Sequence, residues 1–226
     1  MKIAIMQPYF FPYAGYYNLL AQVDKFVIYD DIQFTKKGWI NRNYLNSLSG
    51  PWLFSIPVTN VSAIEIIGQK QIAPEYDRLK LISRIEQNYK KLATPEKLTQ
   101  VKKMINFSTD SLFKYIHFSL MEMSKEIGID PEKIIASSGL GDFANYKGQE
   151  KVIQICKSLN ADVYINPIGG KALYSANTFE ESGILLRFQE PIETTSQNQN
   201  EEIPYLSFLH DYLTLSNVEL RNVVFK

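Results

Sequence analysis

The chain has few of the cysteine and histidine residues that disulfide and zinc sites require. Its 226 residues include one cysteine, Cys156, and two histidines, His117 and His210. A lone cysteine excludes an internal disulfide and suits a reducing compartment. With so few cysteines and histidines, a structural zinc site is close to excluded.

The sequence also lacks an excess of either charge and any long apolar run. Lys plus Arg number 24 and Asp plus Glu number 24, so no broad field attracts a nucleic acid or an anionic membrane. No segment approaches the ~20 apolar residues of a membrane span, and the apolar run that opens the chain is too short for a secretory signal. We therefore expect a cytoplasmic protein whose partner is a small molecule; the oligomeric state is left open.

Four familiar sequence signatures are absent as well. The chain contains no GxxxxGK[ST], no GxGxxG after a strand, no GxSxG and no HExxH. Walker-type phosphate binding, a Rossmann fingerprint, an α/β-hydrolase elbow and a zincin site therefore have no support from motifs.

What is present is an alternation of strand and helix patterns. Helical spacing of apolar residues is expected within 15–24, 75–90, 108–128, 148–160 and 203–215. Short β-prone runs lie at 2–6, 25–30, 52–58, 62–67, 133–138, 162–167 and 184–190. This order predicts a three-layer α/β fold with a mainly parallel sheet and helices on both faces. We expect a single domain over 1–226, with a helical section at about 74–128 and a polar loop at 194–202.

The first chemically informative segment is MQPYFFPYAGYYNLL, residues 6–20. Two prolines interrupt the chain after the first strand, which places Gln7, Tyr9, Tyr13 and Tyr16 at the strand's carboxyl end. Ligands bind at that end of open α/β sheets, although any one of these rings is as readily a core residue. The stretch YFFPYAGY also resembles the histidine-containing loop of adenylyl-forming nucleotidyltransferases, with tyrosines in place of both histidines.

The second segment, DDIQFTKKGWINRNYL, covers residues 30–45. Asp30 and Asp31 end the second strand, where paired carboxylates can hold magnesium, act as acid and base, or form structural ion pairs with nearby cations. Trp39 offers a flat apolar face, Asn41 an amide, and Arg42 a fork that suits a carboxylate or a diphosphate. Sugars and nucleotides are recognised by this mixture.

Two further loops follow predicted strands. In YINPIGGKALY, residues 164–174, Gly169 and Gly170 leave backbone N–H groups that can cradle an anion beside Lys171, and a simple tight turn is an equal alternative. Ser137 and Ser138 follow another strand and add hydroxyls. We expect segments 7–16, 30–42 and 164–174 to meet at one end of the sheet.

Together these stretches resemble the WbqC-like protein family, whose members are typically encoded among bacterial O-antigen and surface-polysaccharide genes. The resemblance is spread over nearly the whole chain. It implies a role in building or decorating a nucleotide-linked sugar.

We therefore expect a transferase that modifies a nucleotide-activated sugar or amino sugar, with acyl or aminoacyl transfer to a sugar amine as the candidate reaction. Asp30 or Asp31 would be the base or a magnesium ligand, Arg42 would bind an anionic group, and His210 would be a reserve acid or base. The sugar pocket would be formed by Gln7, Tyr9, Trp39 and Asn41. Two alternatives stay open: a non-catalytic module that binds a sugar or carrier, and an ATP-using enzyme like the nucleotidyltransferases.

Overall fold

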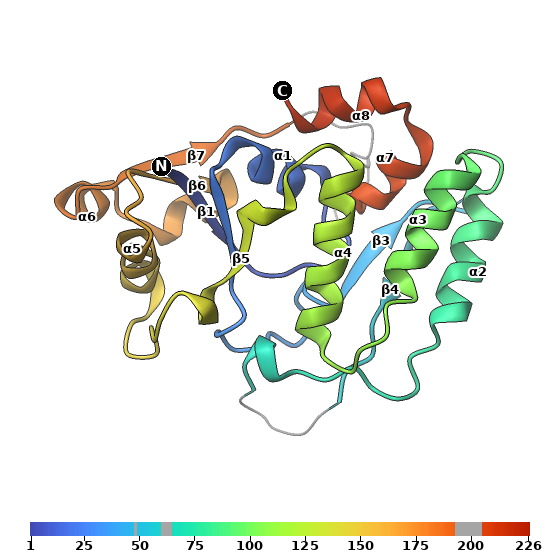
Figure 1. Ribbon diagram of the computed structural model, residues 1–226, viewed down its shortest axis with the longest axis horizontal. Coiled ribbons are helices and arrows are strands. Elements are labelled where there is room, and N and C mark those ends of the chain that lie inside the picture. Colours follow the sequence, from blue (N-terminus) through green and yellow to red (C-terminus); the bar gives the residue numbers. More distant parts are fainter. Residues whose placement is uncertain (48, 60–64, 193–204) are drawn as a thin grey trace.

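A five-stranded parallel sheet lies at the centre of the computed structural model, which describes residues 1–47, 49–59, 65–192 and 205–226 (Figure 1). The strand order is β5-β2-β1-β6-β7, and every neighbouring pair is parallel. The predicted α/β class with a mainly parallel sheet is confirmed. The strands are β1 (Lys2–Met6), β2 (Lys25–Ile28), β5 (Ile134–Ala136), β6 (Val163–Pro167) and β7 (Leu185–Gln189).

Helices cover both faces of this sheet because its strands are apolar on both sides. In β1, Ala4 packs into one hydrophobic cluster, whereas Ile3 and Ile5 pack into another. The cluster around Ala4 contains side chains of α1 (Ala14–Gln22), α4 (Leu112–Glu126), α7 (Phe208–Thr214) and α8 (Asn217–Val224). The opposite cluster contains side chains of α5 (Gly148–Ser158) and α6 (Ala176–Glu181), and these two helices lie on the other side of the strands from α4 in Figure 1.

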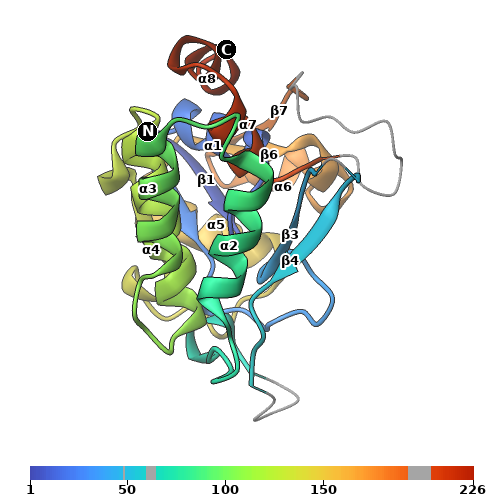
Figure 2. The same cartoon turned by 90° about the vertical axis from the view of Figure 1, so that its right-hand side faces the viewer.

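The middle of the chain adds a helical section and a small hairpin. Helices α2 (Arg78–Tyr89) and α3 (Pro95–Ile105) precede α4, within the section expected to be helical. The antiparallel strands β3 (Arg42–Leu45) and β4 (Trp52–Ser55) lie beside α2 (Figure 2), where the guanidinium of Arg84 stacks 4.0 Å from the ring centroid of Trp52.

One local expectation was wrong, and one strand was not expected. Among the described residues of 62–67, Ile66 makes an isolated bridge with Gln33, and a short 3-10 turn begins at Ile67, instead of a strand. Strand β3, which begins at Arg42, was not among the expected strands. The expected polar loop at 194–202 lies outside the described residues.

Helix ends follow the capping chemistry of the sequence. The side chains of Asp77, Thr94 and Ser111 accept hydrogen bonds from the first turns of α2, α3 and α4. Gly128, which follows α4, has a φ of 80°, a conformation that favours glycine. In α8, Ser216 and Glu219 form a reciprocal capping box.

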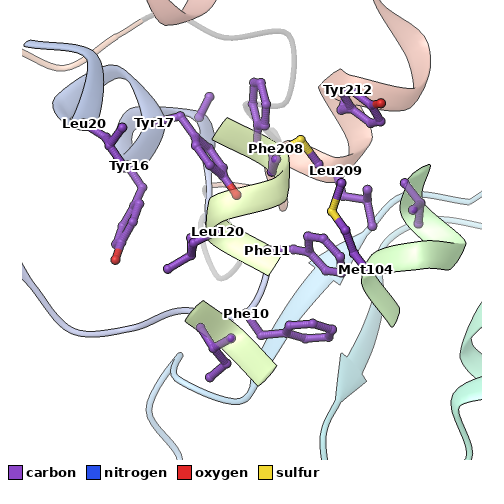
Figure 3. Close-up of a cluster of buried hydrophobic side chains, with 14 of the residues drawn as sticks. Phe10, Phe11, Tyr16, Tyr17, Leu20, Met104, Leu120, Phe208, Leu209 and Tyr212 are labelled. Atoms are coloured by element: carbon purple, nitrogen blue, oxygen red, sulfur yellow. The ribbon is translucent and has the colours of Figure 1, made fainter. Parts of the chain in front are cut away.

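The loop after β1 is anchored in the core by two phenylalanines. Phe10 and Phe11 are buried among side chains that include Leu120 of α4 and Leu209 of α7 (Figure 3). The N–H of Phe10 also donates to the carbonyl of Ile40, 2.9 Å away, which joins this loop to the segment that follows β2. The anchored loop fixes the positions of Tyr9 and Tyr13 on either side of the phenylalanines.

None of the helices in the described ranges combines the length and apolar character needed to cross a membrane.

Candidate functional site

A cavity of about 410 Å³ lies where the strand order reverses. The chain leaves the central strands β1 and β6 in opposite directions along the sheet, and ligands of open α/β sheets bind in the crevice at such a point. We call this cavity the aromatic pocket. It is lined by Met6, Tyr9, Pro12, Tyr13, Trp39, Asn43, Asn166, Pro167, Gly169, Gly170, Leu173, Tyr174 and Tyr205.

Five aromatic side chains give the pocket its character: Tyr9, Tyr13, Trp39, Tyr174 and Tyr205. Tyr13 and Tyr205 lie against each other, with ring centroids 5.5 Å apart, and Trp39 keeps 45% of its surface exposed. Burial, reinforced by the neighbouring phenols Tyr9 and Tyr205, raises the pKa of Tyr13 to about 12. Burial also raises the pKa of Tyr9. Both phenols are therefore protonated near neutral pH and can donate hydrogen bonds.

Two asparagine amides supply the main polar side chains of the wall. Asn43 Nδ2 donates to the carbonyl of Phe11 at 2.7 Å, and its Oδ1 accepts from the N–H of Tyr44 at 2.8 Å. Asn166 Nδ2 donates to the carbonyl of Pro167, and its Oδ1 accepts from the hydroxyl of Tyr164, each at 3.0 Å. Both amides are buried and held in place.

Arg42 braces the loop that carries Trp39. Its Nε donates to the carbonyl of Gly38 at 3.0 Å, a second guanidinium nitrogen donates to the carbonyl of Lys37, and the guanidinium lies 5.4 Å from the Trp39 ring centroid. Lys37 has a φ of 66°, in the left-handed region, so this turn is one that needs support. Among the described residues, the contacts of Arg42 are thus with its own loop, and the ion pair with Asp30 or Asp31 that the sequence allowed is not among them.

The glycines after β6 differ in the room around them. A Cβ on Gly170 would lie 2.0 Å from Asn166 Nδ2, whereas a Cβ on Gly169 would meet nothing within 4 Å. Gly170 therefore permits the close approach that sets the Asn166 amide. Lys171 is exposed and does not line the pocket.

Asp30 and Asp31 lie in a separate group, the carboxylate cluster, formed with Ser137, Ser138 and Lys151. The Asp30 carboxylate accepts from the hydroxyls of both serines and from the N–H of Ser138, 2.9 Å away. Asp31 shares the single hydroxyl hydrogen of Ser137 with Asp30, and it pairs with the ammonium of Lys151 at 2.7 Å. These contacts join the ends of β2 and β5 to α5.

The carboxylate cluster does not fit the magnesium site that the paired carboxylates suggested. In the part of the chain that the structure describes, no three Asp, Glu, His or Cys side chains form a group that could hold a metal ion. The carboxylate oxygens are directed at hydroxyl, amide and ammonium donors. This donor set is that of a structural network.

Four other candidate residues do not line the pocket. The hydroxyl of buried Tyr16 donates to the carbonyl of Gln7 at 3.0 Å, which makes both residues supports of the loop after β1. Asn41 Nδ2 donates to the carbonyl of Ile56 at 2.7 Å. His210 Nδ1 lies 2.9 Å from the hydroxyl of Tyr89, between α7 and α2.

Sequence reasoning did not select several residues of these two groups. Tyr174 and Tyr205 line the pocket, and Lys151 carries the ammonium of the cluster. Tyr174 ends one of the loops already singled out, so its aromatic side chain was an available signal. Lys151 and Tyr205 each lie within an expected helix, 148–160 and 203–215, so their places in these two groups depend on how distant elements pack.

Comparison with known proteins gives a family and one curated relative. The family model for the WbqC-like protein family matches residues 7–222. An uncharacterized protein of Mycobacterium tuberculosis, Rv1507c, is 46% identical over 57 residues, which are 25% of each chain. The present chain thus spans a quarter of the length of that relative. No solved structure matches. Because the family model covers almost all of the sequence, the chain belongs to the WbqC-like protein family.

Proposed function

We propose that the protein is a transferase that binds a nucleotide-linked sugar in the aromatic pocket, within the synthesis of a bacterial O-antigen or surface polysaccharide. One observation carries this proposal: the cavity at the reversal point of the sheet is lined by aromatic rings and fixed amides. Aromatic rings pack against the apolar faces of sugars and bases, and amides bond their oxygens.

The size of the site suits a ligand with two parts. The aromatic pocket has a volume of about 410 Å³, and an adjoining cavity of about 240 Å³ shares Tyr13, Pro167, Gly169 and Tyr205 with it. The second cavity reaches the first turn of α1, whose N–H groups have no side-chain cap, and Glu190 also lines it. A nucleotide and its sugar can therefore occupy neighbouring spaces.

The candidate reaction is transfer of an acyl or aminoacyl group to a sugar amine. Such a reaction needs a group that accepts a proton from the amine. The protonated tyrosines of the pocket are poor bases, and the carboxylate of Asp31 is paired with Lys151. In this proposal the described pocket residues bind and orient the ligand.

A non-catalytic binding module is the second candidate. It is favoured by a specific observation: none of the described residues that line the aromatic pocket carries a formal charge. The ATP-using alternative has weaker support, because Tyr16, at one of the two histidine positions of the resembling loop, is buried and bonded to Gln7.

The experiment that tests the proposal combines binding with turnover. Purified protein is first screened by melting temperature against nucleotide sugars, since a ligand at ~100 times its dissociation constant adds about 2.7 kcal/mol of stability. Any nucleotide sugar that binds is then incubated with acyl donors, with and without ATP, and the molecular masses of the products are measured by mass spectrometry. Binding with transfer supports the proposal, binding without any transfer supports the module, and no binding contradicts both.

A further inference from the structure

We infer that the aromatic pocket selects a neutral ring that presents carbonyl oxygens to Asn43 and Asn166. This inference rests on the proposed function, because it specifies which part of a nucleotide-linked sugar the pocket holds. It follows from two properties of the pocket: the N–H groups of the two amides that have no partner in the described part of the protein, and the absence of formal charge among the described lining residues.

The orientation of the Asn43 amide is fixed by backbone groups. Its Nδ2 faces the carbonyl of Phe11 and its Oδ1 faces the N–H of Tyr44. Rotating the amide by 180° would place N–H against N–H and oxygen against oxygen, which breaks both bonds. Because an amide nitrogen carries two hydrogens, one N–H of Asn43 is left for a ligand.

Asn166 is fixed in a similar way. Its Nδ2 faces the carbonyl of Pro167, which can only accept, so Oδ1 is the atom that accepts from Tyr164. Tyr164 is fully buried and holds this bond away from water. Asn166 therefore also has one N–H available. Each Oδ1 keeps a second lone pair, but an oxygen that already accepts one hydrogen bond is satisfied, whereas a free N–H is an unpaired donor, so the two amides act toward a ligand mainly as donors.

The charge of the wall determines what those donors can bind. The described lining residues carry no formal charge, so a charged group inside the pocket would lose water without gaining an opposite charge. An amino group would meet amide N–H groups and leave donors unpaired. A neutral group that presents carbonyl oxygens satisfies the amides, while the rings of Tyr13 and Trp39 contact its apolar face.

A nucleotide sugar has two sources of this chemistry. The base supplies it when it is uracil or thymine, and the sugar supplies it when its amine carries an acyl group. Cytosine has an amino group where uracil has its C4 carbonyl, and a free amino sugar has an amino group where an acylated one carries its amide carbonyl.

Matched ligands test the inference without altering the fold. Equilibrium titrations compare UDP-glucose with CDP-glucose, which differ in the base, and UDP-N-acetylglucosamine with UDP-glucosamine, which differ in the acyl group. We expect at least one pair to favour the carbonyl-bearing member by about tenfold or more, since a mismatched donor leaves a buried polar group unpaired. The pair that discriminates identifies the source.

Two outcomes distinguish the failures. If ligands bind but the amino-bearing member of each pair binds as tightly as its partner, the inference is overturned and the proposed function stands. If none of the four ligands binds, the proposed function fails and the inference fails with it.

A variant locates the bound ligand in the aromatic pocket. Trp39→Ala should weaken binding of the preferred ligand about tenfold or more, because a stacked aromatic ring contributes that much to binding a base. Leu79→Ala is the matched control, because Leu79 is 72% exposed on α2 and lines none of the cavities described above. Wild-type affinity in Trp39→Ala would place the ligand elsewhere and overturn the inference.

Discussion

The aromatic pocket and the carboxylate cluster lie at the same edge of one sheet but use their polar atoms differently. In the cluster, Asp30 and Asp31 accept hydrogen bonds from serines, and Asp31 pairs with an ammonium. In the pocket, Asn43 and Asn166 each satisfy two internal bonds and keep one N–H beside an open cavity of about 410 Å³. In our proposal the charged residues at this edge of the sheet serve stability, while the neutral residues next to them form the binding site.

The comparison gives a physical rule for this fold. A carboxylate at a strand end can bind a ligand only when its oxygens are not already occupied by hydrogen bonds within the protein. In the carboxylate cluster these oxygens bond to donors that follow β5 or lie in α5, and the bonds hold the ends of β2 and β5 against α5.

Asp31→Asn should destabilise the protein by about 2–4 kcal/mol, because it leaves the buried ammonium of Lys151 without its counter-charge. The side chains of Lys151 and Asp31 are 8% and 19% exposed. Denaturant unfolding of Asp31→Asn, Lys151→Gln and the double variant measures the pair as a double-mutant cycle.

The cycle separates a structural pair from a catalytic or metal-binding carboxylate. We expect a coupling energy above about 1 kcal/mol and unchanged ligand affinity in the variants that fold. Additive stability effects, or activity that disappears from Asp31→Asn at normal stability, would instead favour a chemical role for the carboxylate.

Gly170→Ala should cost about 1–3 kcal/mol and weaken ligand binding, because the new methyl group must displace the Asn166 amide from its two partners. Gly169→Ala adds the same methyl group where nothing lies within 4 Å, so it should leave unfolding unchanged. Thermal unfolding and titration of the two variants side by side check the prediction. Equal behaviour of the two would remove the argument for a fixed Asn166.

Arg42→Lys should lower ligand affinity by about 1 kcal/mol, because lysine cannot bond the carbonyls of Lys37 and Gly38 together while stacking on Trp39. In this account Arg42 is a positioning residue that acts through Trp39. The same substitution in a Trp39→Ala background should then have no further effect on affinity. Additive losses in the double variant would show that Arg42 contacts the ligand directly.

The smallest effect concerns His210, which belongs to neither region. Burial lowers the pKa of His210 below its usual 6.5, although Asp211 opposes the shift. The unfolded chain therefore binds more protons than the folded one as pH falls below about 6.5, so stability is full above that pH and declines below it. His210→Gln should flatten the dependence of melting temperature on pH between about 5 and 7.

Ligand binding should not share this pH dependence. The pKa values of Tyr9 and Tyr13 are raised, so neither phenol changes charge near neutral pH. A dissociation constant that varies strongly between about pH 6 and 8 would indicate a titrating group in contact with the ligand.

The sheet and the location of the pocket could be predicted from the sequence, because they depend on local patterns. Apolar runs such as 2–6 and 162–167 mark parallel strands, and the prolines and glycines after them mark the loops. Which of these loops line the pocket and which form internal ion pairs could not be predicted. Whether Asp31 faces a ligand or Lys151 depends on a contact across 120 positions, and no local pattern encodes such a contact.

The same limit applies to Arg42 and Tyr205. Arg42 has the chemistry of an anion clamp, but its side chain reaches back to the carbonyl of Gly38, four residues earlier. Tyr205 lies within the expected helix 203–215 but precedes α7, and it lines the pocket because α7 packs against the loop after β1, where the N–H of Phe208 donates to the carbonyl of Pro12. Residue type therefore indicated the chemistry, while distant packing determined which residues could use it.

Fluorescence quenching of Trp39 is the most direct test of the account, which assigns ligand binding to the aromatic pocket. The chain has two tryptophans: Trp39 is 45% exposed at the pocket, and Trp52 is 7% exposed in β4. Iodide quenching is measured with and without a nucleotide sugar that raises the melting temperature, in wild-type protein and in Trp39→Phe, which reports Trp52 alone. The account predicts that the ligand protects the wild-type signal and leaves the Trp39→Phe signal unchanged. A bound ligand that leaves the quenching of Trp39 unaltered would contradict it.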